Sequence, residues 1–480
     1  SCLCRKRRLN TLHPGEMMKA NWIVNLHHFI TNKPYQSREL HKTMFPILNP
    51  KGILHKQPDA GYYYLTGEES GTQRINRVGT EILSLCDGKH SINKISTEMA
   101  VRYNESPEHA KSLVTPFLAE SFQRGTILLK AESDSSSNPN NMTGSFNAWV
   151  PLLVSLELTN SCNLTCSHCY ASAQLGNGLF PSVEKVIDLI KNLASNGTFS
   201  IMLSGGEPTM HPQFETILSA ACDHMRLVRV ASNLYSVPRK KLDAILLDKK
   251  VTVQTSVDGL SSTHNLIRGG HSAYARTLSA VKELSSKGTI VIVAMTANRF
   301  NWKQVEEVVV QCKDAGAAAF RLGLTFPNGR AQGTDFCLSL NEVSALQNDW
   351  ASIVEKYSSA DFSLNRSEDA TSYEELTNNN NLVTSCGAGY LIAHIKADGT
   401  ITPCPMLDYP LGNVFTGPLE LALSQEKYPV FSNAISPGNE NCMGCQFAQL
   451  CGSCHAGAKA WGDAEPCWWK STEISRTLSS

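Results

Sequence analysis

The middle of the chain alternates short apolar runs with longer amphipathic segments. The apolar runs have the length of buried strands, and the longer segments repeat apolar residues at helical spacing. The predicted strands lie near residues 152–158, 199–204, 226–231, 251–257, 289–296 and 318–324. The predicted helices lie near residues 182–195, 211–223, 238–247, 273–287 and 302–315. This alternation predicts a parallel α/β sheet, open or closed into a barrel, whose ligand lies at the carboxyl ends of the strands.

Residues 45–130 show a different pattern, which is typical of a small α+β module. Turn residues separate extended segments near 52–56, 61–65 and 71–74. Three helices are expected to follow, near 77–86, after Ser91 and from Pro107 to Phe122, before a closing strand at 125–129. Residues 131–147 are rich in serine and asparagine and predict a flexible linker. Residues 1–44 stay unassigned.

Composition and charge narrow the class of protein. A length of 480 residues suggests two or three domains, and a hydrophobic content of 42% with 18% charged residues allows a large core. The formal net charge is zero, so there is no electrostatic case for a nucleic-acid partner. No apolar run has the length of a membrane span, and the basic residues 5–8 are not followed by the apolar part of a secretory signal. We therefore expect a cytoplasmic protein with reduced cysteines and no membrane partner.

One short stretch after the first strand of this sheet carries Cys162, Cys166 and Cys169. A 4Fe–4S cluster takes four protein ligands, so three thiolates from one loop leave one iron open to bind and reduce a ligand. A zinc ion with a distant fourth ligand is an alternative, but structural zinc sites usually pair cysteines two to four residues apart. A redox dithiol needs only two cysteines. Cluster ligation is therefore the expected role of this loop.

The cysteine spacing, with His168 before the last cysteine, resembles the signature of the radical S-adenosylmethionine (SAM) enzymes. The resemblance implies that Glu207, in a Gly-Gly-Glu turn after the second strand, receives the amino group of SAM. It likewise assigns Arg268 to the SAM carboxylate, whereas Leu324 either packs against adenine or belongs to the barrel core. The SAM contacts implied in this way are His168, Ser204, Gly205, Gly206, Glu207, Asn233, Ser256, Asp258, Arg268 and Leu324. No catalytic side chain is assigned beyond the cluster.

A second set of cysteines lies near the C-terminus. Only five residues separate Cys445 from Cys451, too few for a zinc ribbon, so two interleaved sites are expected. The pattern resembles the SPASM domain, which carries two auxiliary Fe–S clusters. The resemblance implies one cluster at Cys386, Cys404 and Cys454, and a second at Cys442, Cys445, Cys451 and Cys467. The spacing departs from the family at Cys454, where two residues replace the usual three.

The first auxiliary cluster then has three ligands unless Cys222, Cys312 or Cys337 supplies a fourth. An open iron at that cluster could bind a thiolate of the substrate. Three 4Fe–4S clusters are expected in all, one of them binding SAM.

The N-terminal module resembles a PqqD-type recognition element, a winged helix–turn–helix, through residues 76–79 and 83–88. Such elements hold a leader peptide as an added strand of their sheet. A DNA-binding winged helix is the alternative, but the segment lacks a dense basic face. The expected boundaries are then a radical SAM core as a partial (βα)6 barrel at 148–335, a bridging region at 336–385, the SPASM domain at 386–470 and a tail at 471–480.

The three parts together resemble maturases of ribosomally made peptides, most closely the subtilosin-type enzymes that join a cysteine sulfur to an α-carbon. The implied function is hydrogen abstraction by a 5′-deoxyadenosyl radical, then thioether (sactionine-type) cross-linking of a precursor peptide, with flavodoxin or ferredoxin as reductant. Relatives of the same architecture instead make carbon–carbon or ether links, epimerise or decarboxylate. Sulfatase maturases carry aspartate where this chain has Pro405. A non-enzymatic leader-binding or electron-transfer protein is the alternative of a different class.

Overall fold

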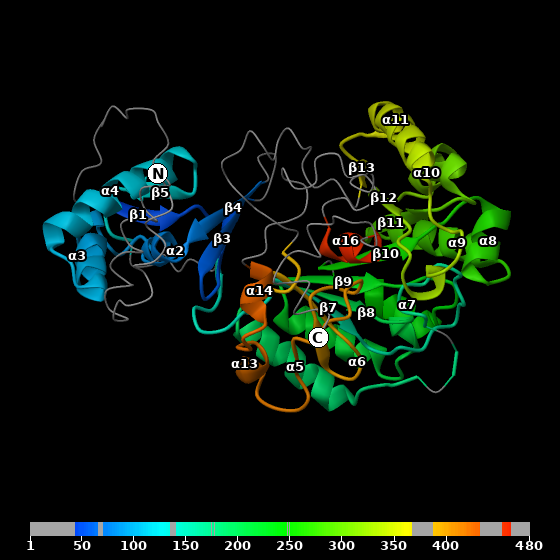
Figure 1. The fold of residues 1–480 in the computed structure, drawn as a ribbon, viewed down its shortest axis with the longest axis horizontal. Coiled ribbons are helices and arrows are strands. Elements are labelled where there is room, and N and C mark those ends of the chain that lie inside the picture. The colour runs from blue at the N-terminus through cyan, green and yellow to red at the C-terminus, as the bar shows by residue number, and fades with distance from the viewer. Residues whose placement is uncertain are drawn as a thin grey trace, which may run out of the picture. The chain divides into compact units, whose positions relative to one another are not determined.

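The computed structural model describes residues 44–65, 71–134, 141–173, 175–176, 178–246, 248, 250–366, 387–432 and 454–461. The chain divides into two compact units, and the boundary falls between Ala148 and Trp149 (Figure 1). Five of the predicted auxiliary-cluster ligands, Cys386, Cys442, Cys445, Cys451 and Cys467, lie outside the described residues.

The first unit is the predicted α+β module. Its larger sheet has the order β4-β3-β2-β6, and a smaller sheet pairs β1 with β5 in antiparallel fashion. The strands are β1 (Phe45–Leu48), β2 (Gly52–Lys56), β3 (Ala60–Leu65), β4 (Gly71–Asn76), β5 (Ile127–Lys130) and β6 (Met142–Gly144). The helices are α2 (Arg77–Ser84), α3 (Ile92–Tyr103) and α4 (Pro107–Gln123). The three helices and four predicted strands are confirmed, whereas β1 and β6 were not predicted.

Polar caps explain where these helices begin. The side chains of Asn76, Ser91 and Ser106 each accept a hydrogen bond from a backbone N–H in the first turn of the following helix. Behind the caps, the helices pack apolar faces against the strands, and Leu54, Ile82, Met99, Val114 and Leu118 are fully buried.

The flexible-linker prediction is wrong for residues 141–147. Strand β6 pairs in parallel with β2, and the buried Asn141 amide donates to the backbone oxygens of Asn49 and Gly52 at 2.9 and 3.0 Å. The Arg77 guanidinium lies 4.0 Å from the centre of the Phe146 ring. The serine- and asparagine-rich composition predicted flexibility. The segment is instead anchored to the first unit by the Asn141 amide, which donates to two carbonyls, and by the Phe146 ring, which packs on Arg77.

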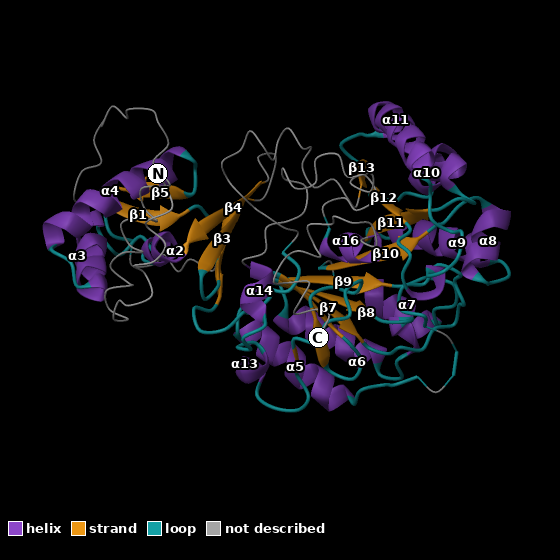
Figure 2. Cartoon of the chain, in the orientation of Figure 1, coloured by secondary structure: helices purple, strands orange, loops and turns teal. Residues whose placement is uncertain are grey.

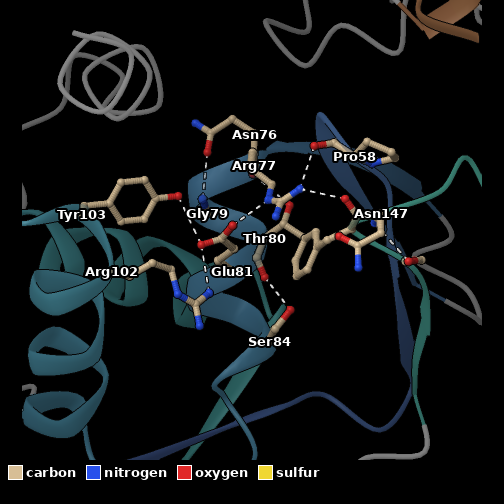
Figure 3. A network of polar contacts seen from close by, with 12 residues as sticks. Pro58, Asn76, Arg77, Gly79, Thr80, Glu81, Ser84, Arg102, Tyr103 and Asn147 are labelled. Carbon is tan, nitrogen blue, oxygen red and sulfur yellow. Dashed lines mark hydrogen bonds and ion pairs between the residues drawn. The ribbon is translucent and has the colours of Figure 1, made fainter. Parts of the chain in front are cut away.

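A buried carboxylate ties two helices of this unit together (Figure 3). Glu81 on α2 is 5% exposed and binds Arg77 Nε at 2.5 Å and Arg102 Nη1 at 2.9 Å. The Tyr103 hydroxyl on α3 also donates to Glu81, at 3.1 Å. Glu81 therefore forms ion pairs with two arginines of this unit, Arg77 and Arg102.

The second unit is built on a ten-stranded sheet of order β13-β12-β11-β10-β9-β8-β7-β14-β15-β16 (Figure 2). From β7 to β13 all neighbouring strands are parallel. These strands are β7 (Leu153–Glu157), β8 (Ser200–Ser204), β9 (Leu227–Ala231), β10 (Val251–Ser256), β11 (Ile290–Ala297), β12 (Ala319–Leu324) and β13 (Ser363–Arg366). The six predicted strands of the partial barrel are confirmed, and β13 adds a strand that was not predicted.

Helices follow the strands of this sheet. They are α5 (Val183–Ser195), α6 (Phe214–His224), α7 (Arg239–Leu246), α8 (Ser261–Arg268), α9 (Ala273–Ser286), α10 (Val305–Asp314) and α11 (Leu340–Tyr357). Short 3-10 turns are η2 (Pro208–Met210), η3 (Trp302–Gln304) and η4 (Gly329–Ala331). Helix α8, which is eight residues long, was not predicted.

The C-terminal segment extends the same sheet. Strand β14 (Ile392–Ile395) pairs in parallel with β7, and β15 (Thr400–Thr402) and β16 (Gly412–Asn413) continue from it in antiparallel fashion. Short helices α13 (Leu419–Ala422), α14 (Tyr428–Ser432) and α16 (His455–Trp461) complete the described part. Strand β7 is thus flanked by β8 on one side and by a C-terminal strand on the other.

Among the helices in the described ranges, none combines the length and the apolar character that crossing a membrane requires.

Replacing Glu81 by alanine should destabilise the first unit. The two arginines keep 36% and 47% of their side chains exposed, so they are not stranded in the core, and we expect a loss of about 1–3 kcal/mol. Amide hydrogen exchange of α2 and α3 in the full chain measures this loss. The exposed Glu132→Ala is the matched control, and equal protection in both variants would contradict the structural role of the network.

Candidate active site

The three cysteines of the loop after β7 come together in the structure. Cys162 and Cys166 are buried, Cys169 is half-buried, and Leu164, Ala173 and Tyr235 pack around them. All three cysteines line one cavity of about 360 Å³. Within the described ranges, no three acidic, histidine or cysteine side chains are grouped tightly enough to hold a single metal ion.

Burial affects the protonation of two of these thiols, Cys162 and Cys166. Burial raises the pKa of Cys162 to about 11. Burial also raises the pKa of Cys166, although the Arg268 guanidinium beside it acts in the opposite direction. Thiols with raised pKa values become thiolates when a cationic centre binds them. This donor set fits an iron–sulfur cluster, for which thiolates are the usual ligands.

Most of the predicted SAM contacts line the same cavity, because they follow the carboxyl ends of neighbouring parallel strands. The lining includes His168, Gly205, Gly206, Asn233, Ser256, Arg268 and Leu324. The Asn233 amide lies 3.7 Å from Cys162 Sγ and donates to the Asn163 side chain at 2.8 Å. Ser204, Glu207 and Asp258 lie behind this surface and do not line the cavity.

Glu207 is engaged by protein donors. It is 1% exposed, and its Oε1 accepts from the hydroxyls of Thr209 and Ser232 at 2.6 and 2.8 Å. Its Oε2 accepts from the backbone N–H of Asn233 at 2.8 Å. Burial raises the pKa of Glu207, and these hydrogen bonds oppose that rise. In this structure the side chain therefore joins the end of β8 to the end of β9, and its contact with the amino group of SAM stays a prediction.

Gly205 and Gly206 are required by contact with the cysteine loop. A Cβ at Gly205 would lie 2.2 Å from the Thr159 carbonyl oxygen, and its φ of +134° disfavours any other residue. A Cβ at Gly206 would lie 2.1 Å from the Ser161 carbonyl oxygen. The sequence suggested that these glycines admit a ligand, and they do line the cavity. The structure adds that they also allow the turn after β8 to pack directly on the loop that presents the cysteines.

Asp258 positions Arg268. Asp258 is fully buried, and its Oδ2 lies 2.6 Å from Arg268 Nε and 3.2 Å from His168 Nε2. Burial alone would raise the pKa of Asp258, but the charges of Arg268 and His168 outweigh it and hold the pKa well below its usual range. Arg268 in turn places Nη1 3.7 Å from Cys166 Sγ. In this structure Asp258 holds a guanidinium at the cavity wall, and its predicted contact with SAM stays a prediction.

Some lining residues were not predicted from the sequence. Thr296 lies in β11, one residue before its end, and Thr325 follows β12, so both share the strand-end position of the predicted contacts, which is the signal that could have found them. Arg330 donates to the backbone oxygens of Cys166 and Ala173 at 2.7 and 2.8 Å. Phe326 and Met406 also line the cavity, and no local pattern marks either residue.

A second cavity, of about 540 Å³, adjoins the first. Tyr170, Ala171, Gly206 and Met406 line both. Most of its remaining wall comes from the turn after β12, from residues 394–408 around β14 and β15, and from α16. The two cavities therefore connect the cysteine loop with the C-terminal segment.

The described auxiliary cysteines lie beside this second cavity. Cys404 immediately precedes Pro405 and Met406, which line it, and Cys454 precedes α16, which contributes Ala456. Cys222 and Cys312 are buried on α6 and α10, within the helix layer, and are poorly placed as a fourth ligand. Cys337 follows Phe336, whose ring stacks on His168 at 6.5 Å, so Cys337 lies on the strand-end side.

Family models match three parts of the chain. Residues 61–127 match the model of coenzyme PQQ synthesis protein D (PqqD), and residues 156–312 match the radical SAM superfamily. Residues 386–446 match the iron–sulfur cluster-binding (SPASM) domain. The chain therefore carries a radical SAM domain between a PqqD-like domain and a SPASM domain, and the cofactors of this combination are SAM, a 4Fe–4S cluster and auxiliary clusters.

Curated relatives share parts of this organisation. The chain is 32% identical over 276 residues to the sporulation killing factor maturation protein SkfB of Bacillus subtilis, covering 58% of this chain and 65% of SkfB. It is 27% identical over 439 residues to the subtilosin biosynthesis protein AlbA of the same organism, covering 86% of this chain and 92% of AlbA. The match thus spans somewhat less than two thirds of SkfB and most of AlbA.

A solved structure has the same fold. The crystal structure of Streptococcus suis SuiB bound to precursor peptide SuiA matches with a TM-score of 0.58 at 14% identity, covering 88% of this chain and all of SuiB.

Replacing Asp258 by asparagine should weaken SAM binding. Without the anionic partner, Arg268 loses its buried ion pair and its fixed position, and we expect about a tenfold or larger rise in the dissociation constant. Equilibrium dialysis of SAM against anaerobically reconstituted protein measures the change, and the visible absorption of the cluster should persist. Asp314→Asn, an exposed aspartate at the end of α10, is the control. Unchanged affinity in the Asp258 variant would show that Arg268 does not depend on this partner.

Proposed function

We propose that this chain is a radical SAM maturase that installs thioether cross-links, from cysteine sulfur to an α-carbon, in a ribosomally made precursor peptide. The observation that carries the proposal is that the two cavities adjoin and share Tyr170, Ala171, Gly206 and Met406 as lining residues. One peptide segment can then meet the cysteine loop at one end and the C-terminal cysteine region at the other. The likeness to SkfB and AlbA, whose names place them in peptide maturation and bacteriocin biosynthesis, supports the same reading.

The proposal assigns the cluster ligands by position. Cys162, Cys166 and Cys169 hold the SAM-binding cluster. The first auxiliary cluster takes Cys386, Cys404 and Cys454, and the second takes Cys442, Cys445, Cys451 and Cys467. The assignment of Cys162, Cys166 and Cys169 is supported by the one cavity that all three line. When bound, the SAM-binding cluster supplies the electron that cleaves SAM and so generates the hydrogen-abstracting radical.

The remaining tasks belong to side chains of the chain itself. Arg268, held by Asp258, places a positive charge where the carboxylate of SAM would bind. Arg330 fixes the backbone of the cysteine loop through Cys166 and Ala173. Apolar lining residues such as Leu324 and Phe326 help exclude water from the cavity, which protects a reactive radical.

The first unit is proposed to bind the leader of the precursor. Strand β4 ends the order of its sheet, so its outer edge has no partner strand among the described strands, and a leader can add there as a further strand. The match to the PqqD family and the SuiB structure with its precursor peptide support this assignment. Flavodoxin or ferredoxin is the proposed source of electrons.

The direct test supplies reduced, reconstituted protein with SAM and the short cysteine-containing peptide encoded beside it. We expect release of 5′-deoxyadenosine and loss of two hydrogen atoms from the peptide for each link, both measured by mass spectrometry. Fragmentation that places the link between a cysteine and a non-adjacent α-carbon supports thioether formation. A link without sulfur would point to the carbon–carbon or ether alternative, and absence of deoxyadenosine would favour a non-enzymatic binding protein.

Two cysteine variants should separate the steps. Cys166→Ala should abolish deoxyadenosine release, because the loop would lose one of three ligands. Cys404→Ala should retain some deoxyadenosine release and lose the cross-linked product. The same mass spectrometric assay checks both, with Cys312→Ala as a control outside the proposed cluster ligands. If both variants lost both activities equally, the proposed division of labour would be wrong.

Removing residues 1–148 should weaken precursor binding more than the cleavage of SAM in the absence of peptide. The boundary is the one at which the chain divides into its two units. Fluorescence anisotropy of a labelled precursor and the deoxyadenosine assay measure the two effects. An equal decrease of both would contradict a leader-binding role for the first unit.

A further inference from the structure

Two buried ionisable side chains line the second cavity, Glu157 at the end of β7 and His394 in β14. Glu157 Oε1 lies 3.1 Å from His394 Nε2, and Oε2 accepts from the backbone N–H of Ala397 at 3.3 Å. The side chains of Glu157 and His394 are 10% and 2% exposed. Both carboxylate oxygens are therefore held in place, while the carboxylate keeps a small exposed surface at the cavity.

The strands themselves do not require this pair. The parallel ladder from Ile392↔Leu153 to Ile395↔Leu156 already joins β14 to β7. A buried ion pair is weak evidence for stabilisation, because apolar side chains of similar volume often serve a core equally well. A carboxylate and an imidazole kept together at a cavity wall instead suit proton transfer.

The position of Glu157 matches the path proposed for the substrate. Tyr170 lines both cavities, whereas Glu157 lines the second one together with Pro405 and Met406, which follow Cys404. A peptide that runs from the first cavity toward Cys404 would pass this carboxylate.

Other charged groups face the same cavity, but none is a comparable acceptor. They are Lys396, Asp398, Asp408 and Lys459, with the Tyr170 phenol beside them. Lys396 is paired with Asp408 at 2.7 Å. Asp398 and Asp408 are exposed to solvent, whereas Glu157 is buried. Glu157 is thus the carboxylate of this cavity that is shielded from water.

We propose that Glu157 accepts the proton of the substrate cysteine during cross-linking, and that His394 positions the Glu157 carboxylate. The proposal rests on the thioether function above. After hydrogen abstraction, the peptide carries a carbon-centred radical. The carbon–sulfur bond forms as the S–H bond breaks, the proton passes to Glu157, and the remaining electron passes to an iron–sulfur cluster as oxidant. Atoms and charge then balance, because each link releases one proton and one electron at this step.

The test compares Glu157→Gln with Glu184→Gln, the same substitution at an exposed position on α5. The substrate is the cysteine-containing peptide of the preceding assay, labelled with deuterium at the acceptor α-carbon. In Glu157→Gln we expect deuterium transfer to 5′-deoxyadenosine to persist while thioether formation falls about 100-fold, the usual contribution of a general base. In Glu184→Gln both should match the unmodified protein.

Substrate acidity distinguishes a lost base from a damaged fold. Thioether formation by Glu157→Gln should recover as the pH rises through roughly 8.5, where a free thiol ionises by itself. It should also recover with a peptide that carries selenocysteine, because a selenol is already ionised at neutral pH. A purely structural pair would give no recovery in either case. Lack of both recoveries, or thioether formation at the unmodified rate, would overturn the inference.

Measurements without cofactors complete the test. The melting temperature of the cofactor-free protein, and its affinity for the labelled precursor, should be similar in Glu157→Gln and in the unmodified chain. For the positioning role, His394→Gln, which keeps an N–H donor, should retain more cross-linking than His394→Leu. Equal loss in both His394 variants would overturn that role. If the unmodified chain removed no hydrogen from the peptide, the proposed function itself would be overturned. This outcome differs from normal cross-linking by Glu157→Gln, which would overturn only the role of Glu157.

Discussion

Parallel pairing on both sides of β7 is the constraint on which the rest of the second unit depends. Because β8 and β14 both run parallel to β7, their carboxyl ends meet at the edge where the cysteine loop begins. The loop thus faces strand-end residues from β8 to β12 on one side and the C-terminal segment on the other. Two adjoining cavities, which share four lining residues, lie at this edge.

Buried charge organises the edge of the sheet that carries the site. Asp258 keeps Arg268 beside Cys166, Glu207 joins the ends of β8 and β9, and Glu157 is held by His394. Each carboxylate is desolvated and each has protein partners, as buried charges require. The roles differ with the partner. A guanidinium keeps Asp258 anionic, neutral donors surround Glu207, and Glu157 is held by an imidazole and one backbone N–H.

The two units differ in how a peptide would meet them. The first offers the edge of a small sheet, where backbone hydrogen bonds accept many sequences and side chains add selectivity. The second offers two adjoining cavities, where a single residue of the peptide would be placed beside the cysteine loop. This separation allows one binding site for a constant leader and another for the segment that is modified. The segment at 141–147, anchored by Asn141 and Phe146, belongs to the first unit.

Local patterns in the sequence determined the alternating strands and helices, the cysteine loop and the residues at the strand ends. From β7 to β13, strands that are consecutive in the chain are also neighbours in the sheet, so residues at successive strand ends lie at one edge. A strand-end position therefore predicted a shared cavity for His168, Asn233, Ser256 and Arg268. Only the tertiary structure showed that Asp258 pairs with Arg268, that Gly205 packs on Thr159, and that β14 lies beside β7. These relations join residues far apart in the chain, and their side chains carry no periodic signal. Packing decided them, and it alone brought Glu157 to His394 across 237 positions.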